Sequence, residues 1–153
     1  LDYPNLVEDH GLEVTHLSQF IRQQSQDSEL NMDSKKMEGT ATYQDACRLS
    51  RHLGVYEDPR ELIVGAGLDL VEMEHMRKAS LCCGTTGWTS CGKVSKNIQV
   101  QRLREAKATG AELLITSCVK CQIHFKCAQQ DPILENEIDI PIRDLTTVLA
   151  DRL

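Results

Sequence analysis

Short apolar runs alternate with amphipathic stretches along this chain. Five runs rich in apolar or β-branched residues predict strands, at positions 12–17, 39–43, 69–73, 113–116 and 138–142. Between and after them, apolar residues at helical spacing predict helices. Strands that alternate with helices usually form parallel sheets flanked by those helices. The pattern therefore predicts an α/β fold with a mainly parallel sheet of about five strands.

Turn and cap residues mark the ends of the predicted helices. Gly54 and Gly110 each follow a predicted helix, and glycine commonly ends a helix because it tolerates positive φ. Ser95 is expected to be the N-cap of the helix that ends before Gly110. The charged segment 25–39 has little periodicity, so we expect it to be a surface loop.

Length, charge and cysteine count narrow the class of protein. A chain of 153 residues suits one domain, and its core must be aliphatic because aromatic residues make up only 4%. The net charge is −6 with both signs interspersed, which argues against binding to nucleic acid. No run approaches the roughly eighteen consecutive apolar residues of a membrane span. Seven cysteines, an odd number, without a signal-like leader favour a reducing compartment. We therefore expect a cytoplasmic protein whose membrane association, if any, goes through another protein of the same complex.

The cysteines come from three places in the chain. A Cys-Cys-Gly sequence occupies positions 82–84, where a positive φ at Gly84 would turn the backbone so that both thiols reach one object. Between Cys47 and this sequence lie 34 residues, and 33 residues separate it from a CxxC formed by Cys118 and Cys121. Such an arrangement of thiols indicates a ligand site.

The predicted strands explain how such distant thiols can meet. Cys47 follows the strand predicted at 39–43, and Cys118 follows the strand predicted at 113–116. Ligands of open α/β sheets collect outside the carboxyl ends of the strands. Cys121 falls in the first turn of the next helix, where free N–H groups favour thiolate over thiol.

A set of soft thiolates selects zinc, copper(I) or an iron–sulfur cluster. A structural zinc ion needs four ligands, usually from two CxxC-like knuckles, and only one knuckle is present. A polynuclear cluster has several irons to share among five sulfurs, so the count favours a cluster. A structural or complex-assembly module with zinc on four of the same cysteines is the alternative.

The cysteine spacing resembles that of the CCG domain found in the B and D subunits of heterodisulfide reductase. Segments 43–63 (YQDACRLSRHLGVYEDPRELI) and 104–121 (REAKATGAELLITSCVKC) are similar to the family's sequences around its first cysteine and its CPxC. The resemblance covers most of the chain and suggests the C-terminal CCG domain of a protein like the D subunit. Since the chain begins at Leu1, we expect it to be part of a longer iron–sulfur protein.

The resemblance implies a non-cubane 4Fe–4S cluster whose ligands are Cys47, Cys82, Cys83, Cys118 and Cys121. It also implies an electron-transfer domain of an oxidoreductase complex, with other redox subunits as partners. Departures from the family's pattern occur beside the ligands, as at Ala46, Arg48, Val119 and the Thr85-to-Trp88 run. They leave open whether the cluster reduces a thiol or disulfide substrate or only relays electrons.

Several other residues lie close to the motif in sequence. Cys91, His124 and His52 are candidates for side chains beside the cluster, the two histidines as proton donors. Cys127 is expected to be structural. The helix after the Cys-Cys-Gly sequence is basic, and we expect a solvated face there, with docking of an acidic electron carrier as the alternative. Its basic residues are Lys93, Lys96, Arg102, Arg104 and Lys107.

Overall fold

A computed structural model describes residues 14–26, 37–85 and 92–151 of the chain. Within them, four strands form one parallel sheet in the order β2-β1-β3-β4. The strands are β1 (Thr40–Gln44), β2 (Asp69–Leu70), β3 (Leu113–Thr116) and β4 (Ile142–Asp144). The predicted α/β class and parallel sheet are confirmed, with four strands in place of about five.

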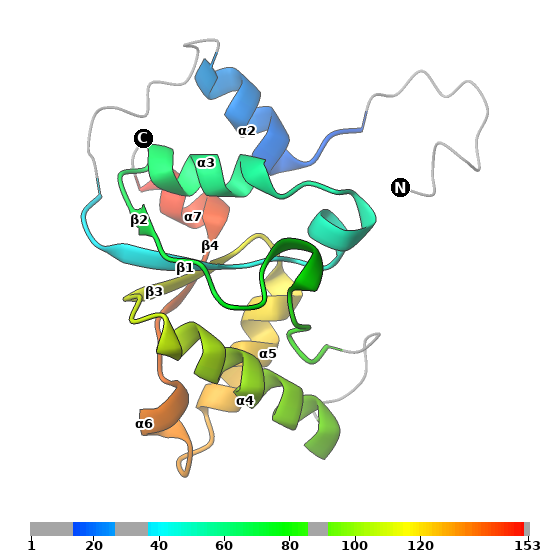
Figure 1. The fold of residues 1–153 in the computed structure, drawn as a ribbon, viewed down its shortest axis with the longest axis vertical. Helices are drawn as coiled ribbons and strands as arrows, with labels where there is room; N and C mark the ends of the chain where they lie inside the picture. Colours follow the sequence, from blue (N-terminus) through cyan, green and yellow to red (C-terminus); the bar gives the residue numbers. More distant parts are fainter. Residues whose placement is uncertain (1–13, 27–36, 86–91, 152–153) are drawn as a thin grey trace, which may run out of the picture.

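Helices cover both faces of the sheet (Figure 1). One face carries α3 (Glu57–Gly65) and α7 (Leu145–Ala150), with α2 (Leu17–Gln26) packed on α3. The other carries α4 (Lys93–Ala108) and α5 (Val119–Gln129), with the short α6 (Glu135–Ile138) against α4. Two short helices, η1 (Arg48–His52, a π-helix) and η2 (Arg77–Ala79, a 3₁₀-helix), follow β1 and β2.

Side chains alternate across the sheet and fill one apolar core on each face. In β1, Ala41 and Tyr43 point to the α3 side, whereas in β3 Ile115 joins them and Leu114 joins the core under α4. The core is mainly aliphatic, as expected from the composition, since Tyr43 and Phe125 are the two aromatic residues among the buried residues of these cores. This alternation follows from the two-residue period of a strand.

The chain crosses the sheet in two directions from β1. From β1 it passes through α3 to β2 on one side, and then through α4 to β3 on the other side of β1. The carboxyl ends of β1 and β3 are therefore adjacent, at the point where the strand order reverses. Open α/β sheets bind their ligands at such a point.

The N-terminal strand prediction is wrong in the part of it that the structure describes. Positions 12 and 13 lie outside the described residues, residues 14–16 are irregular, and Leu17 begins α2. His16 and Gln19 cap this helix reciprocally: the Ser18 N–H donates to His16 Nδ1, and the His16 N–H donates to Gln19 Oε1. A capping box normally begins with Ser or Thr, so His16 did not indicate a helix start in the sequence. The loop predicted at 25–39 holds for residues 37–39, while α2 extends to Gln26 and residues 27–36 lie outside the described residues.

Two other strand predictions need correction. Of the strand predicted at 69–73, the structure has only Asp69–Leu70. Of that predicted at 138–142, Ile138 ends α6 and Ile142 begins β4. Ile138 and Ile140 are buried because they pack in the core under α4, not because they belong to a central strand.

Candidate thiolate site

The CxxC lies where β3 passes into α5. Cys118 occupies the N-cap position of α5, and Cys121 is buried in the first helical turn, as predicted. The pKa of the half-buried Cys118 thiol is lowered to about 6, because it accepts hydrogen bonds from the Cys121 thiol and from the N–H groups of Cys121 and Lys120. A helix N-terminus thus stabilises a thiolate at this position.

The vicinal cysteines contact the CxxC directly. Cys83 is buried, and its pKa is lowered because it accepts hydrogen bonds from the thiols of Cys121 and Cys82. Its sulfur also lies 2.9 Å from the hydroxyl oxygen of Thr85. The pKa of Cys121 is raised, because its proton is shared with Cys118 and Cys83. Four thiols from two distant segments therefore form a connected series.

Gly84 has the backbone conformation that the motif predicted. Its φ is +79°, and its backbone lies so close to α4 that an added Cβ would be 2.6 Å from Ser95 O and 2.8 Å from Gln99 Cγ. The Ser95 hydroxyl donates to the Gly84 carbonyl. The N-cap position of α4 is occupied by Gly92, so the predicted role of Ser95 as N-cap is wrong. The serine instead attaches the turn to the helix.

A buried arginine holds the segment that leads into the vicinal cysteines. Arg102 is fully buried, and its guanidinium donates to Gln44 Oε1 at 2.5 Å, to Ser80 Oγ at 3.0 Å and to Glu105 Oε2 at 2.6 Å. Gln44 in turn donates to the carbonyl of Leu81 at 3.2 Å. The end of β1 and the residues before Cys82 are thereby joined.

The prediction that the basic residues of α4 form a solvated face is wrong for Arg102 alone, because Lys93, Arg104 and Lys107 are exposed and Lys96 is half-buried. Arg102 is in the interior. Arg104 pairs with Glu137, Lys96 with Asp131, and Lys107 donates to the carbonyl of Asp139. Arg102 was indistinguishable from its neighbours in sequence because its acceptors lie on distant segments.

A second buried ion pair lies beside Cys47. Asp45 pairs in a bidentate manner with Arg60, at 2.8 and 2.9 Å, and the guanidinium of Arg60 also lies 5.2 Å from the ring centroid of Tyr43. Asp45 Oδ2 also accepts the N–H of Arg77, at 2.7 Å, where the backbone has φ +53°. Asp45 lies two residues before the first cysteine, and its hydrogen bond to Arg77 thus joins the start of η2 to the segment after β1. Sequence reasoning passed over both members of this pair.

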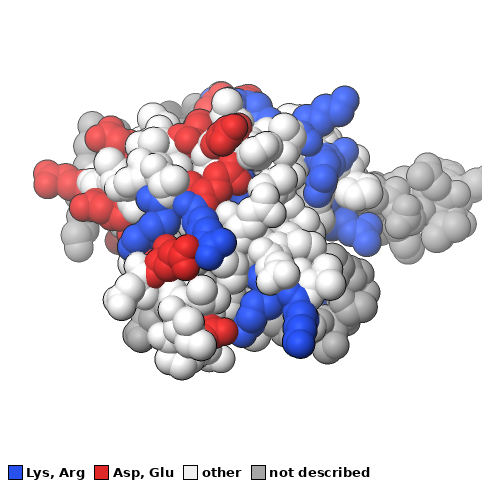
Figure 2. Space-filling model, turned by 60° about the horizontal axis from the view of Figure 1, so that its bottom comes forward, with Lys and Arg blue, Asp and Glu red and all other residues white. Residues whose placement is uncertain are grey.

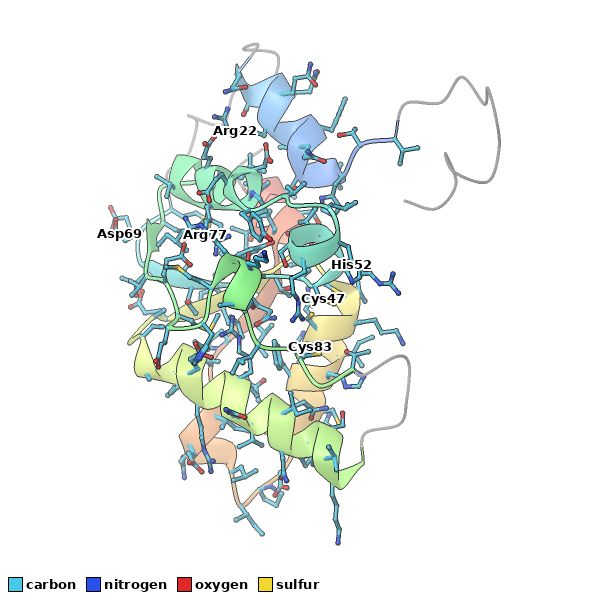
Figure 3. All side chains as sticks on the ribbon, turned by 45° about the vertical axis from the view of Figure 1, so that its right-hand side comes forward. Arg22, Cys47, His52, Asp69, Arg77 and Cys83 are labelled. Carbon is cyan, nitrogen blue, oxygen red and sulfur yellow. The ribbon has the colours of Figure 1, made fainter. Side chains whose placement is uncertain are left out.

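The remaining predicted site residues have different positions. Figure 3 shows Cys47 and Cys83 on the same side of the molecule, with His52 beyond Cys47. Cys47 is half-buried and occupies the N-cap position of η1, three residues after the end of β1. His52 is exposed.

His124 and Cys127 are on α5, and Cys91 lies outside the described residues. His124 is 8% exposed, and its Nδ1 lies 3.0 Å from Gln99 Nε2, which in turn donates to Ser95 Oγ. His124 is thus linked to the Gly84 turn through two side chains. Cys127 is half-buried on α5, three residues after His124.

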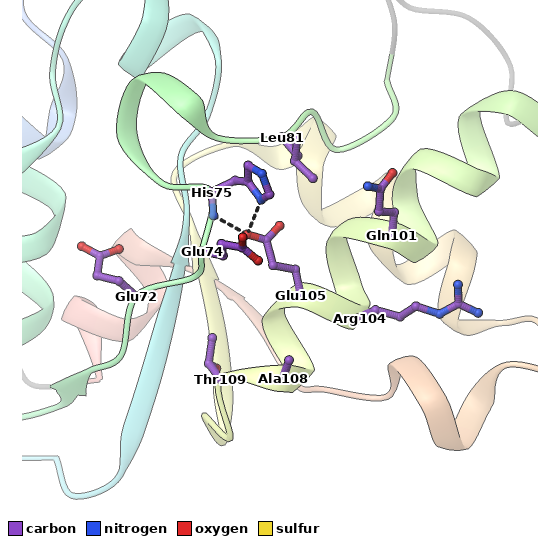
Figure 4. Close-up of a pocket in the computed structure, with 9 residues that line it drawn as sticks. All are labelled: Glu72, Glu74, His75, Leu81, Gln101, Arg104, Glu105, Ala108 and Thr109. Carbon is purple, nitrogen blue, oxygen red and sulfur yellow. Dashed lines mark hydrogen bonds and ion pairs between the residues drawn. The ribbon is translucent and has the colours of Figure 1, made fainter.

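A cavity of about 450 Å³ lies between α4 and the segment before η2 (Figure 4). It contains no thiol, and Glu105 on its wall accepts hydrogen bonds from the N–H of His75 and from Arg102. Glu72 on the same wall pairs with Arg60. Glu72 and Glu105 therefore hold together the segments behind the cysteines, and the thiols remain the candidate site.

The thiols are soft donors, but they do not surround a position for a single metal ion. In the part of the chain that is described, no group of three or more His, Cys, Asp or Glu side chains is placed to hold a metal ion. The contacts instead run in series, Cys118 to Cys121 to Cys83 to Cys82. Such a row of soft donors suits a group with several metal atoms better than one tetrahedral ion.

A parallel α/β sheet with thiols from separate segments at its carboxyl edge defines a cysteine-rich ligand-binding domain. The chain belongs to the CCG family of cysteine-rich domains, whose pattern matches residues 41–126. This match includes all five cysteines of the predicted ligand set. The resemblance seen in the sequence is confirmed.

Similar proteins cover much or all of this chain. It is 27% identical over its whole length to the D subunit of the dihydromethanophenazine:CoB–CoM heterodisulfide reductase of Methanosarcina acetivorans, and spans 37% of that protein. It is 31% identical, over 82% of its length, to 24% of the B subunit of the fumarate reductase (CoM/CoB) of Methanothermobacter marburgensis. It is 30% identical, over 78% of its length, to 17% of a probable iron–sulfur-binding oxidoreductase of Bacillus subtilis. The chain thus spans less than two fifths of each relative.

Proposed function

We propose that this domain binds an iron–sulfur cluster through Cys47, Cys82, Cys83, Cys118 and Cys121. The observation that carries the proposal is the connected series of four thiols at the carboxyl edge of the sheet, with Cys47 at the end of the neighbouring strand. The lowered pKa values of Cys83 and Cys118 support it, because thiolates are the ligands of such clusters.

The number of sulfurs supports a cluster of the non-cubane 4Fe–4S type. Five thiolates exceed the four that a cubane cluster or a structural zinc ion takes. The thiols also differ in exposure, since Cys83 and Cys121 are buried whereas Cys47, Cys82 and Cys118 are half-buried. The buried pair would exclude water and the half-buried ones would face an electron-transfer partner.

When bound, the cluster would supply one-electron chemistry, and the protein would determine its position and access. The hydrogen bonds described above lower the pKa values of Cys118 and Cys83 and so favour their thiolates, and Cys121 would give up its proton on binding. Arg102 and Ser95 would keep the Cys82–Gly84 turn in place. None of the described helices is long and apolar enough to cross a membrane.

The domain would act as the electron-transfer part of a multi-subunit oxidoreductase, with other redox subunits as its partners. The names of its relatives, which include a heterodisulfide reductase and an iron–sulfur-binding oxidoreductase, support this role. The narrower form of the proposal is reduction of a disulfide, which would take two electrons from the partner proteins and two protons to leave as two thiols. Among the described residues His124 is the buried histidine, and its link to the Gly84 turn makes it the candidate for proton delivery.

Anaerobic metal analysis of Cys83→Ala and Cys127→Ala tests the assignment. Wild type and Cys127→Ala should be brown and hold about four irons per chain, whereas Cys83→Ala should lose the cluster absorption. A colourless wild-type protein holding one zinc per chain would establish the zinc-binding assembly module instead. Equal iron in the two variants would remove Cys83 from the ligand set. Far-UV circular dichroism of both variants separates loss of ligand from loss of fold.

A further inference from the structure

The two elements that carry Cys47 and the CxxC are basic within an acidic chain. The whole chain has 23 acidic and 17 basic residues. In contrast, η1 and α5 together contain four basic residues and no Asp or Glu, namely Arg48, Arg51, Lys120 and Lys126. Charge of one sign that gathers around a site steers partners of the opposite sign.

Three of these side chains are exposed and have no carboxylate partner among the described residues. Arg48, Arg51 and Lys126 make no ion pair with any described residue. By contrast, Arg22, Arg104 and Arg143 each pair with a carboxylate. The positive charge of these three side chains is therefore not neutralised by any described carboxylate.

Acidic residues next to these elements are mostly engaged elsewhere. Asp45 is buried against Arg60, Glu57 pairs with Arg77, and Asp131, which follows α5, pairs with Lys96. Asp58 is the remaining acidic residue at the start of α3, and it is half-buried. Figure 2 shows the resulting separation: basic side chains dominate the right-hand part of this face, and most acidic side chains lie to the left.

The exposed side of α5 also carries apolar residues. Val119 and Ile123 are 66% and 55% exposed. They are four residues apart, and Lys126 follows three residues later, so all three share one side of the helix. Protein interfaces commonly have an apolar centre and a polar rim.

This surface adjoins two of the half-buried thiols, those of Cys47 and Cys118. Cys118 directly precedes Val119, and Cys47 directly precedes Arg48. Cys118 also packs against the small core that contains Leu49 of η1, so the start of α5 lies beside η1.

We propose that this basic face of η1 and α5, defined by Arg48, Arg51, Val119, Ile123 and Lys126, docks the acidic surface of an electron-transfer protein. The inference rests on the proposed cluster, because docking here would bring the partner's redox centre against Cys47 and Cys118. An acidic protein fits the uncompensated charge and the apolar centre together.

The test uses the holoprotein and an acidic 2Fe–2S ferredoxin as the electron donor, with the rate followed by stopped flow. The triple variant Arg48→Gln, Arg51→Gln, Lys126→Gln removes three positive charges from the face. The matched control Arg22→Gln, Arg104→Gln, Arg143→Gln removes three positive charges elsewhere, each from a surface ion pair of the kind that contributes little to stability. Iron content and the visible spectrum are measured first for all three proteins.

At low ionic strength the face variant should react at least about tenfold more slowly, with a flatter salt dependence, while the control stays within about twofold. Equal slowing in both variants would show that only net charge matters and would overturn the docking face. No slowing in either would overturn it as well. Charge-dependent sedimentation with phosphatidylserine vesicles, without an effect on ferredoxin, would assign the face to a membrane surface instead. A wild-type preparation without iron would overturn the proposed function, and that result is read before any rate.

Discussion

Gly84→Ala gives the sharpest test of how the fold presents the vicinal cysteines. Gly84 combines a φ of +79° with close contact to α4, where an added Cβ would lie 2.6 Å from a backbone oxygen, that of Ser95. Gly110 has nearly the same φ, +73°, but an added Cβ there would meet nothing within 4 Å. Substitution by alanine therefore costs both glycines the strain of a positive φ, but only at Gly84 does the added Cβ also clash with α4.

The expected magnitudes follow from this difference. A positive φ costs a residue with a side chain about 1–2 kcal/mol, and Gly110→Ala should lose about that much stability. Overpacking adds about 1–3 kcal/mol, so Gly84→Ala should lose about 2–5 kcal/mol. Because Ser95 O belongs to the helix backbone, the turn rather than the helix must move. That movement would displace Cys83 from Cys121.

Urea unfolding and iron content measure the two effects separately. We expect Gly110→Ala to keep full iron content with a modestly lower unfolding midpoint. Gly84→Ala should have a lower midpoint still and should hold less iron per chain. Equal midpoints and equal iron in the two variants would refute the close packing of the turn on α4.

Two further predictions concern the scaffold behind the cysteines. Arg102→Met keeps a similar side-chain volume but leaves Gln44 and Ser80 without their buried donor. It should lower the free energy of unfolding, measured in urea, by about 3–5 kcal/mol, and metal analysis should find less iron per chain. Glu105 is subject to burial, which raises its pKa, but hydrogen bonds from the His75 N–H and Arg102 outweigh this and lower it below 4.5. Its stabilising contribution is therefore present above pH 4.5 and is lost as pH falls through the folded-state pKa. Urea unfolding of the metal-free protein should show a smaller loss below pH 4.5 in Glu105→Gln than in wild type. An equal loss would contradict this assignment.

Much of the site was accessible from the sequence because it depends on local features. The Cys-Cys-Gly turn needs a residue that tolerates positive φ, and Gly84 has a positive φ in the structure. The strand at 113–116 and the CxxC at the following helix start were predicted correctly, because a short apolar run and the residues after it determine both. The α/β class followed from the alternation of such segments along the chain.

What only the tertiary structure decided involves partners that are distant in sequence. The order β2-β1-β3-β4 places the end of β1 beside the end of β3, and with them Cys47 near the CxxC, yet parallel strands pair without any local signal of which neighbour they take. The burial of Arg102 depends on acceptors on other segments. Ser95 lies within α4 rather than at its N-cap, and its hydroxyl donates to the Gly84 carbonyl of a distant segment. The strand pattern at 138–142 reflected burial under α4 rather than pairing in the sheet. Apolar burial and hydrogen-bond satisfaction select among distant segments, and only the packed structure brings those segments together.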